Sequence, residues 1–158
     1  MRGKYVYAGL ILCVCILTGC YVNGRLYPVQ GPLSAQAPPP IFSARMSGAL
    51  FSGNLTIVLA DHEVCTGTWG MVSRKPTAGN TSTTKATPDL SSAWDAVYGQ
   101  GFYTSHILGA RLHVQSELTG NKGTILHVEL YRPDTQEGIN EIKGVGKDNN
   151  GNLYKLVF

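Results

Sequence analysis

One cysteine and three histidines are the side chains of this sequence with the clearest chemical potential. Cys65 could act as a nucleophile, and His62, three residues earlier, is a nearby base. A reactive thiol needs such a base or a positive environment. The surrounding pattern instead predicts a β-hairpin that puts His62 at the turn and Cys65 beside Gly67 on a strand. This favours a buried structural cysteine, although thiol chemistry remains an alternative.

A second candidate group combines His113, His127 and Glu129. These residues alternate with apolar ones along two segments that we expect to pair, so they share the polar face of one hairpin. Two imidazoles and a carboxylate could hold zinc. An exposed polar strand face has the same pattern, and we predict no metal and no cofactor.

Other chemical motifs are missing from the sequence. The run from Asp148 to Asn152 carries oxygen ligands, but Leu153 occupies the place where a calcium loop needs glycine. There is no nucleophile elbow, zinc-protease helix, phosphate loop or dinucleotide fingerprint. We therefore expect a protein that is not an enzyme. The alternative is a small periplasmic metal-binding or thiol-dependent enzyme.

The first twenty residues are typical of a secretion signal. Arg2 and Lys4 precede an apolar run that is too short to span a bilayer as a helix. The run ends in Leu17-Thr18-Gly19-Cys20, which resembles the lipobox of bacterial lipoprotein signal peptides. The resemblance implies that residues 1–19 are removed and that the Cys20 thiol receives lipid, palmitate being a typical acyl chain.

The resemblance to small bacterial lipoproteins also implies a location. Such proteins stay at the inner membrane when aspartate follows the lipidated cysteine, and here Tyr21 follows it. We expect a lipid-anchored protein of the cell envelope, at the periplasmic face or the surface of the outer membrane rather than at the inner membrane. The membrane is then one partner, through Cys20, and an envelope protein or glycan is a possible second partner.

The charge balance gives no reason to expect nucleic acid. Without Arg2 and Lys4, 11 of the 13 basic residues remain against 10 acidic ones. This near-neutral balance lacks the basic patch of a nucleic-acid-binding protein. Because Cys13 and Cys15 leave with the signal and Cys20 carries lipid, Cys65 has no partner for an intramolecular disulfide.

The chain after the signal divides into two parts. Residues 20–42 are rich in proline, and we predict a lipid-anchored tether. Residues 43–158 are predicted to form a single β domain, which opens with a strand over Met46 to Phe51. An insertion over residues 73–104 carries a short helix from Asp89 to Tyr98 and covers one end of the domain.

Three hairpins follow from alternating apolar residues and turn signals. Their strands span Asn54 to Ala60 with Glu63 to Trp69, Arg111 to Leu118 with Thr124 to Tyr131, and Ile139 to Lys147 with Leu153 to Phe158. The expected cross-strand pairs are Val58 with Cys65, Val114 with Val128, His113 with Glu129, Gln115 with His127, and Val145 with Leu156.

Together these elements predict an all-β fold. We expect a compact antiparallel β-sandwich or barrel of about seven strands with one short helix in the inserted loop. The expected function is that of a membrane-anchored envelope lipoprotein, a non-enzymatic binding or structural module. A ligand-carrying β-barrel with a central apolar cavity is a further alternative.

Overall fold

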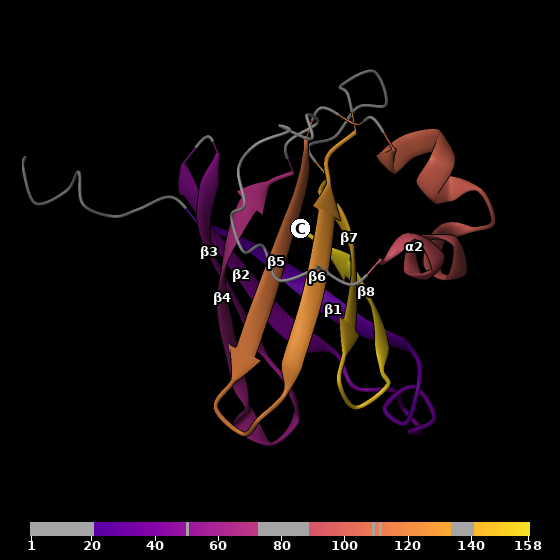
Figure 1. The fold of residues 1–158 in the computed structure, drawn as a ribbon. Coiled ribbons are helices and arrows are strands. Elements are labelled where there is room, and N and C mark those ends of the chain that lie inside the picture. The colour runs from indigo at the N-terminus through magenta and orange to yellow at the C-terminus, as the bar shows by residue number, and fades with distance from the viewer. Residues whose placement is uncertain (1–20, 50, 73–88, 109, 111, 134–140) are drawn as a thin grey trace, which may run out of the picture.

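The protein folds as a closed, eight-stranded antiparallel β-barrel (Figure 1). The computed structural model describes residues 21–49, 51–72, 89–108, 110, 112–133 and 141–158. Each strand pairs with the next, and the last pairs with the first. The strands are β1 (Tyr21–Gln30), β2 (Phe42–Ala49), β3 (Ser52–Val58), β4 (Val64–Met71), β5 (His113–Gly120), β6 (Ile125–Tyr131), β7 (Lys143–Asp148) and β8 (Leu153–Val157). The predicted all-β fold is confirmed, and its form is a barrel.

The barrel encloses one apolar core, because alternate residues of each strand point inward. An eight-stranded barrel is just wide enough for side chains to fill it. Gly144 on β7 faces the interior, where a Cβ atom would lie 2.5 Å from Leu130 Cδ2. The buried interior residues include Leu26, Phe42, Leu55, Ile57, Cys65, Leu118, Leu126, Val128, Leu130, Tyr154 and Leu156.

The predicted tether is wrong for residues 21–30, which form β1. This strand closes the barrel by pairing with both β2 and β8. Leu26 and Pro28 are buried, whereas Arg25, the residue before Leu26, is exposed. Proline is tolerated because beyond Leu26 the strand pairs only with β8, and a register irregularity follows Pro28. The proline-rich segment is instead the loop of residues 31–41. The predicted signal peptide and the predicted lipidation site Cys20 lie outside the described residues.

Two predicted hairpin registers are wrong by one residue. Val58 pairs with Val64 because the connecting loop, the 3-10 turn η2 (Ala60–His62), has three residues. Val145 pairs with Lys155 and points away from Leu156. A one-residue shift moves a side chain to the opposite face of the sheet. Val145 therefore lies on the outer wall of the barrel.

The hairpin of β5 and β6 is shifted by two residues, so its faces are as predicted. Val114 pairs with Leu130, and Gln115 pairs with Glu129. His113 lies opposite Tyr131. The apolar residues face the core and the polar residues face outward, because a shift of two preserves the alternation.

The insertion between β4 and β5 contains the helix α2 (Ser91–Tyr98) and the π-helical turn η3 (Tyr103–Ile107). The helix is confirmed: the Ser91 amide donates to Asp89 Oδ1 at 2.9 Å, and Gly99 ends the helix with φ of 112°. The insertion packs on the outer wall against β7 and β8 (Figure 1), not over an end of the barrel as predicted. In the described ranges no helix has the length and apolar character needed to cross a bilayer.

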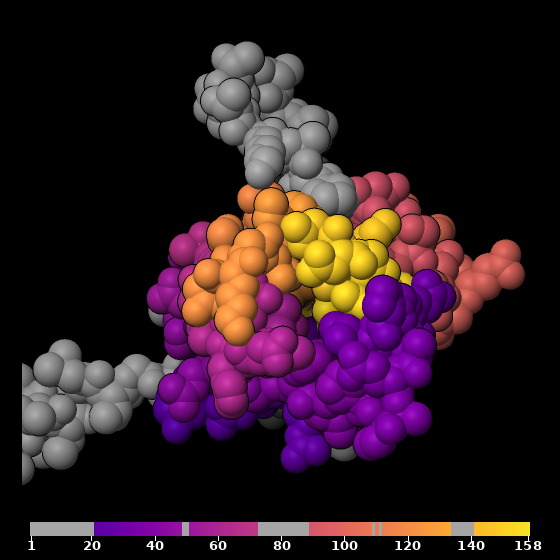
Figure 2. All heavy atoms as spheres, turned by 90° about the horizontal axis from the view of Figure 1, so that it is seen from below, coloured from indigo at the N-terminus to yellow at the C-terminus, as the bar shows by residue number. Residues whose placement is uncertain are grey.

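Figure 2 views the barrel from the end that we call the base, where hydrogen bonds join neighbouring loops. The base consists of the loops of residues 31–41, 60–62, 121–124 and 149–152. Buried Glu63 accepts hydrogen bonds from the Thr124 hydroxyl at 2.8 Å and from the backbone amides of Lys122 and Thr124 at 3.1 Å. Burial alone raises the pKa of Glu63, but these bonds and the Lys122 charge outweigh it and lower the pKa below its usual value.

Side-chain hydrogen bonds also join the β7–β8 loop to the other loops of the base. Asp148 Oδ2 accepts hydrogen bonds from the Tyr154 hydroxyl at 2.7 Å and from the Asn152 side chain at 2.8 Å. Asn152 Oδ1 accepts from the Leu33 amide at 3.0 Å, and Asn149 Oδ1 accepts from the Ile125 amide at 3.0 Å. Each loop of the base is thus bonded to a neighbour.

Candidate functional site: a cleft beside the barrel and the barrel mouth

A cleft of about 480 Å³ lies between the insertion and the outer wall of the barrel. Tyr103, Ile107 and Leu108 line it from the insertion, and His113 and Gln115 line it from β5. Typical small-molecule sites measure about 300–1,000 Å³ and combine apolar walls with a few polar groups. The cleft has this size and composition.

A buried carboxylate organises the polar side of the cleft. Glu129 points outward from β6, yet its side chain is only 3% exposed because Trp94 of α2 covers it. The Trp94 indole donates to Glu129 Oε2 at 2.7 Å, and the Gln115 side chain donates to Oε1. Burial raises the pKa of Glu129, but these bonds and the approach of His113 outweigh it and hold the pKa below its usual value.

His113 lies beside Glu129. The Nε2 atom of His113 is buried and lies 3.6 Å from Glu129 Oε2. A histidine whose one nitrogen faces a carboxylate presents the other nitrogen to its surroundings. His113 also lines the cleft, so its imidazole ring can contact a molecule there. Burial and the charges of Glu129 and Asp89 raise the pKa of Tyr103, whose hydroxyl therefore stays protonated.

Stacked aromatic rings hold the insertion against the barrel. Trp94 stacks on Tyr98 and on Phe102, with ring centroids 5.4 and 5.9 Å apart. The Tyr98 hydroxyl lies 3.3 Å from the carbonyl oxygens of Gly144 and Leu156, and burial raises its pKa to about 12. This packing fixes the wall of the cleft that the insertion provides.

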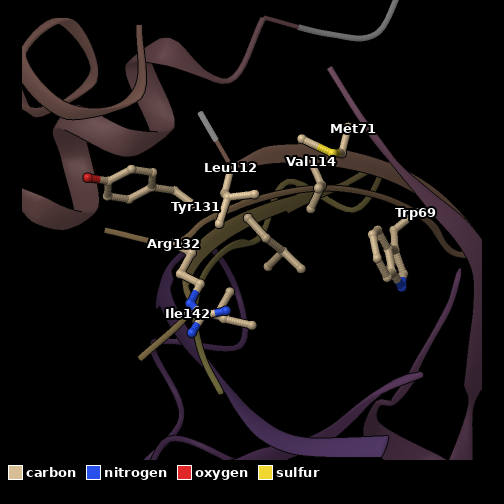
Figure 3. Close-up of a pocket in the computed structure, with 8 residues that line it drawn as sticks. Trp69, Met71, Leu112, Val114, Tyr131, Arg132 and Ile142 are labelled. Carbon is tan, nitrogen blue, oxygen red and sulfur yellow. The ribbon is translucent and has the colours of Figure 1, made fainter. Parts of the chain in front are cut away.

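The end of the barrel opposite the base, which we call the mouth, contains a smaller pocket. Its volume is about 110 Å³. Figure 3 shows Trp69 on one side and Arg132 and Ile142 across from it. A cavity of roughly 150 Å³ can hold benzene, so the mouth has room for about one side chain or the tip of an acyl chain. Below it the core residues fill the barrel, which does not favour a large central cavity.

The structure separates the sequence-predicted candidates. Cys65 is buried in the barrel core, and burial together with the charges of Glu63 and Asp148 raises its pKa to about 11. A thiol in such surroundings is a poor nucleophile. His62 lies exposed in the β3–β4 loop and does not join Cys65.

The predicted histidine group divides into two pairs. His113 and Glu129 do lie together, but His127 Nδ1 lies 3.6 Å from Glu117 Oε2 farther along the hairpin. In the part of the chain that the structure describes, no three histidine, cysteine or acidic side chains lie close enough to hold a metal ion.

Sequence reasoning missed Gln115 and Tyr103, which line the cleft, and Trp94, which covers Glu129. Gln115 could have been found, because it lies on the same strand face as His113 and directly opposite Glu129 once the register is correct. Trp94 and Tyr103 lie at the outer wall of the barrel only because the insertion packs there. The alternation of apolar and polar residues along the strands does not predict that packing.

Comparison with known proteins adds no relative to this description. No protein-family model, curated protein or solved structure matches the chain. Its function must therefore be argued from its own residues.

Proposed function

We propose that the chain is a lipid-anchored envelope lipoprotein whose barrel is a non-enzymatic binding module. The observation that supports binding is the cleft, where His113 and Gln115 lie beside a buried carboxylate and next to the apolar residues of the insertion. The anchor rests on the lipobox resemblance of residues 17–20, with Cys20 as the acylated residue. Tyr21 after it favours the outer membrane.

The chemistry of the cleft favours a neutral glycan as the ligand. With Nε2 directed at Glu129, His113 Nδ1 can accept a hydrogen bond, and the Tyr103 hydroxyl can donate and accept. Ile107 and Leu108 offer an apolar surface beside them. N-acetylated sugars carry hydroxyl and amide donors together with apolar faces. Such sugars in envelope glycan are the ligand class that we propose.

Titration of residues 21–158 with N-acetylglucosamine oligomers, followed by amide NMR, tests this function. All eight strands lie within this stretch, so it contains the whole barrel. We expect saturable shifts concentrated at Tyr103, His113 and Gln115. His113→Ala should weaken binding about tenfold, which corresponds to the loss of about 1.4 kcal/mol.

His127→Ala is the matched control. It changes a histidine of the same hairpin face that pairs with Glu117 outside the cleft, so binding should be unchanged. Absence of saturable shifts up to about 10 mM ligand, a binding free energy weaker than about −3 kcal/mol, would contradict the proposal. Equal losses from the two histidine changes would contradict the placement in the cleft.

A further inference from the structure

The lipid anchor would join the barrel at one end and without a spacer. β1 begins at Tyr21, which is the residue directly after Cys20. Adjacent Cα atoms are about 3.8 Å apart, so acyl chains on Cys20 would start within a side-chain length of the barrel. The contrast with a flexible tether is large, because twenty extended residues would span roughly 60–70 Å.

Tyr21 lies at the mouth of the barrel. It pairs with Ser47 near the end of β2, and β3 begins at the same end, where Ala49 pairs with Ser52. The C-terminal Phe158 bonds with Ile142 there too, and Ile142 lines the mouth pocket. An anchor at Cys20 would therefore hold the mouth, rather than the base, toward the lipid.

Exposed apolar side chains concentrate at this same end. In the described ranges, six of the eight large apolar residues that are exposed lie around the mouth. They are Tyr21, Val22, Phe51, Val72, Leu108 and Leu112. We call these six residues the rim. Phe51 is 68% exposed at the tip of the β2–β3 turn. Exposed apolar groups gathered in one region of a protein mark a surface that contacts a partner or a membrane.

Basic side chains of the described part of the chain lie near the rim. The Arg45 guanidinium stands 4.1 Å above the centre of the Tyr21 ring, and Arg132 lines the mouth. Arginine near apolar and aromatic side chains suits the boundary of a bilayer, where lipid phosphates meet acyl chains. The rim thus combines apolar area, an aromatic ring and positive charge.

We infer that the rim docks on the lipid bilayer, so that the barrel stands with its mouth on the membrane and its base directed away from it. This inference rests on the proposed lipid anchor at Cys20 and adds the orientation. The acyl chains supply the attachment, and side chains such as Phe51 enter the headgroup region beside them. The cleft, which Val72 and Leu108 border, then opens close to the membrane surface.

Site-specific fluorescence on the mature lipoprotein in vesicles tests the orientation. Phe51→Cys and Ile41→Cys each introduce one labelling site, at the rim and in the base loop respectively, and the original side chains are similarly exposed at 68% and 58%. Cys65 should resist labelling because it is buried with a raised pKa. Each variant carries a nitrobenzoxadiazole label in vesicles of phosphatidylethanolamine, phosphatidylglycerol and nitroxide-labelled lipid.

We expect the label at position 51 to shift to the blue and to be quenched severalfold more than the label at position 41. Equal quenching at both positions, or stronger quenching at 41, would overturn the inference. The intact mass of the same sample reports the lipid on Cys20 independently. An acylated protein without quenching at 51 overturns the rim docking and leaves the anchor. A protein that lacks lipid overturns the anchor and, with it, the orientation.

Discussion

The two ends of the barrel differ in the side chains that the described residues place there. At the base, carboxylate and amide side chains such as Glu63 and Asn152 bond to the backbone of neighbouring loops. At the mouth, apolar side chains such as Phe51 and Leu112 stay exposed around a small pocket. Buried polar groups that are fully bonded specify one arrangement of the chain. Among the described residues, hydrogen bonds between loops thus stabilise the base, whereas apolar side chains stay exposed around the mouth.

Removal of β1, the strand that closes the barrel, should have the largest effect on stability. A chain that starts at Ser43 lacks β1, which pairs with β2 and β8 and closes the barrel. We expect no cooperative unfolding transition for this truncated chain, because β2 and β8 would become open strand edges and the core residues that Leu26 covers would be exposed. Circular dichroism during heating measures it, with residues 21–158 as the control. A truncated chain that keeps the melting temperature would show that β1 is dispensable.

A change at the centre of the base should have the next largest effect. Glu63→Ala leaves the buried Thr124 amide and hydroxyl without their acceptor. Each buried polar group left unpaired costs about 1–3 kcal/mol, so urea unfolding should show a loss of at least about 2 kcal/mol. Glu63→Gln keeps an acceptor oxygen and should lose less. A loss below about 0.5 kcal/mol for Glu63→Ala would show that the base does not stabilise the fold.

Acid should weaken the base through the same carboxylate. The folded-state pKa of Glu63 is lowered, so its contribution is complete above the unfolded pKa of about 4.3 and disappears as pH falls through the lower folded value. Glu129 also has a lowered pKa and contributes in the same direction. The difference in unfolding free energy between the natural protein and Glu63→Gln should therefore shrink from pH 7 to pH 3. A constant difference would contradict this.

Changes at the rim should have the smallest effect on stability. Phe51→Ser and Leu112→Ser replace exposed side chains, so each should alter the free energy of unfolding by no more than about 0.5 kcal/mol. The same urea titration measures them beside the Glu63 variants. A loss near 2 kcal/mol from either change would mean that the mouth is packed as firmly as the base.

The sequence predicts the β class, the helix and the inward and outward faces of the β5–β6 hairpin. These features depend on local patterns, such as Val114 and Leu118 alternating with polar residues. The tether prediction failed because prolines near Pro28 resemble a linker, whereas strand pairing across the whole chain length places Leu26 in the core. The one-residue register errors came from loops whose length the turn residues alone do not determine.

The candidate site was partly predictable for a similar reason. His113 and Glu129 share a strand face whatever even shift the hairpin takes, so their proximity follows from alternation. The cleft itself needs the insertion to lie on the outer wall. That placement depends on Val145 facing outward beneath α2, which the predicted register reversed.

Photo-crosslinking in cells tests most directly whether the mouth end carries the function. A benzophenone amino acid at Leu108, which borders the cleft near the rim, is compared with the same amino acid at Ile41 in the base loop. The two side chains are similarly exposed, at 65% and 58%. The full chain should form crosslinks to envelope components from position 108 and few from position 41. Crosslinks from position 41 that equal or exceed those from position 108 would contradict a functional mouth and a structural base.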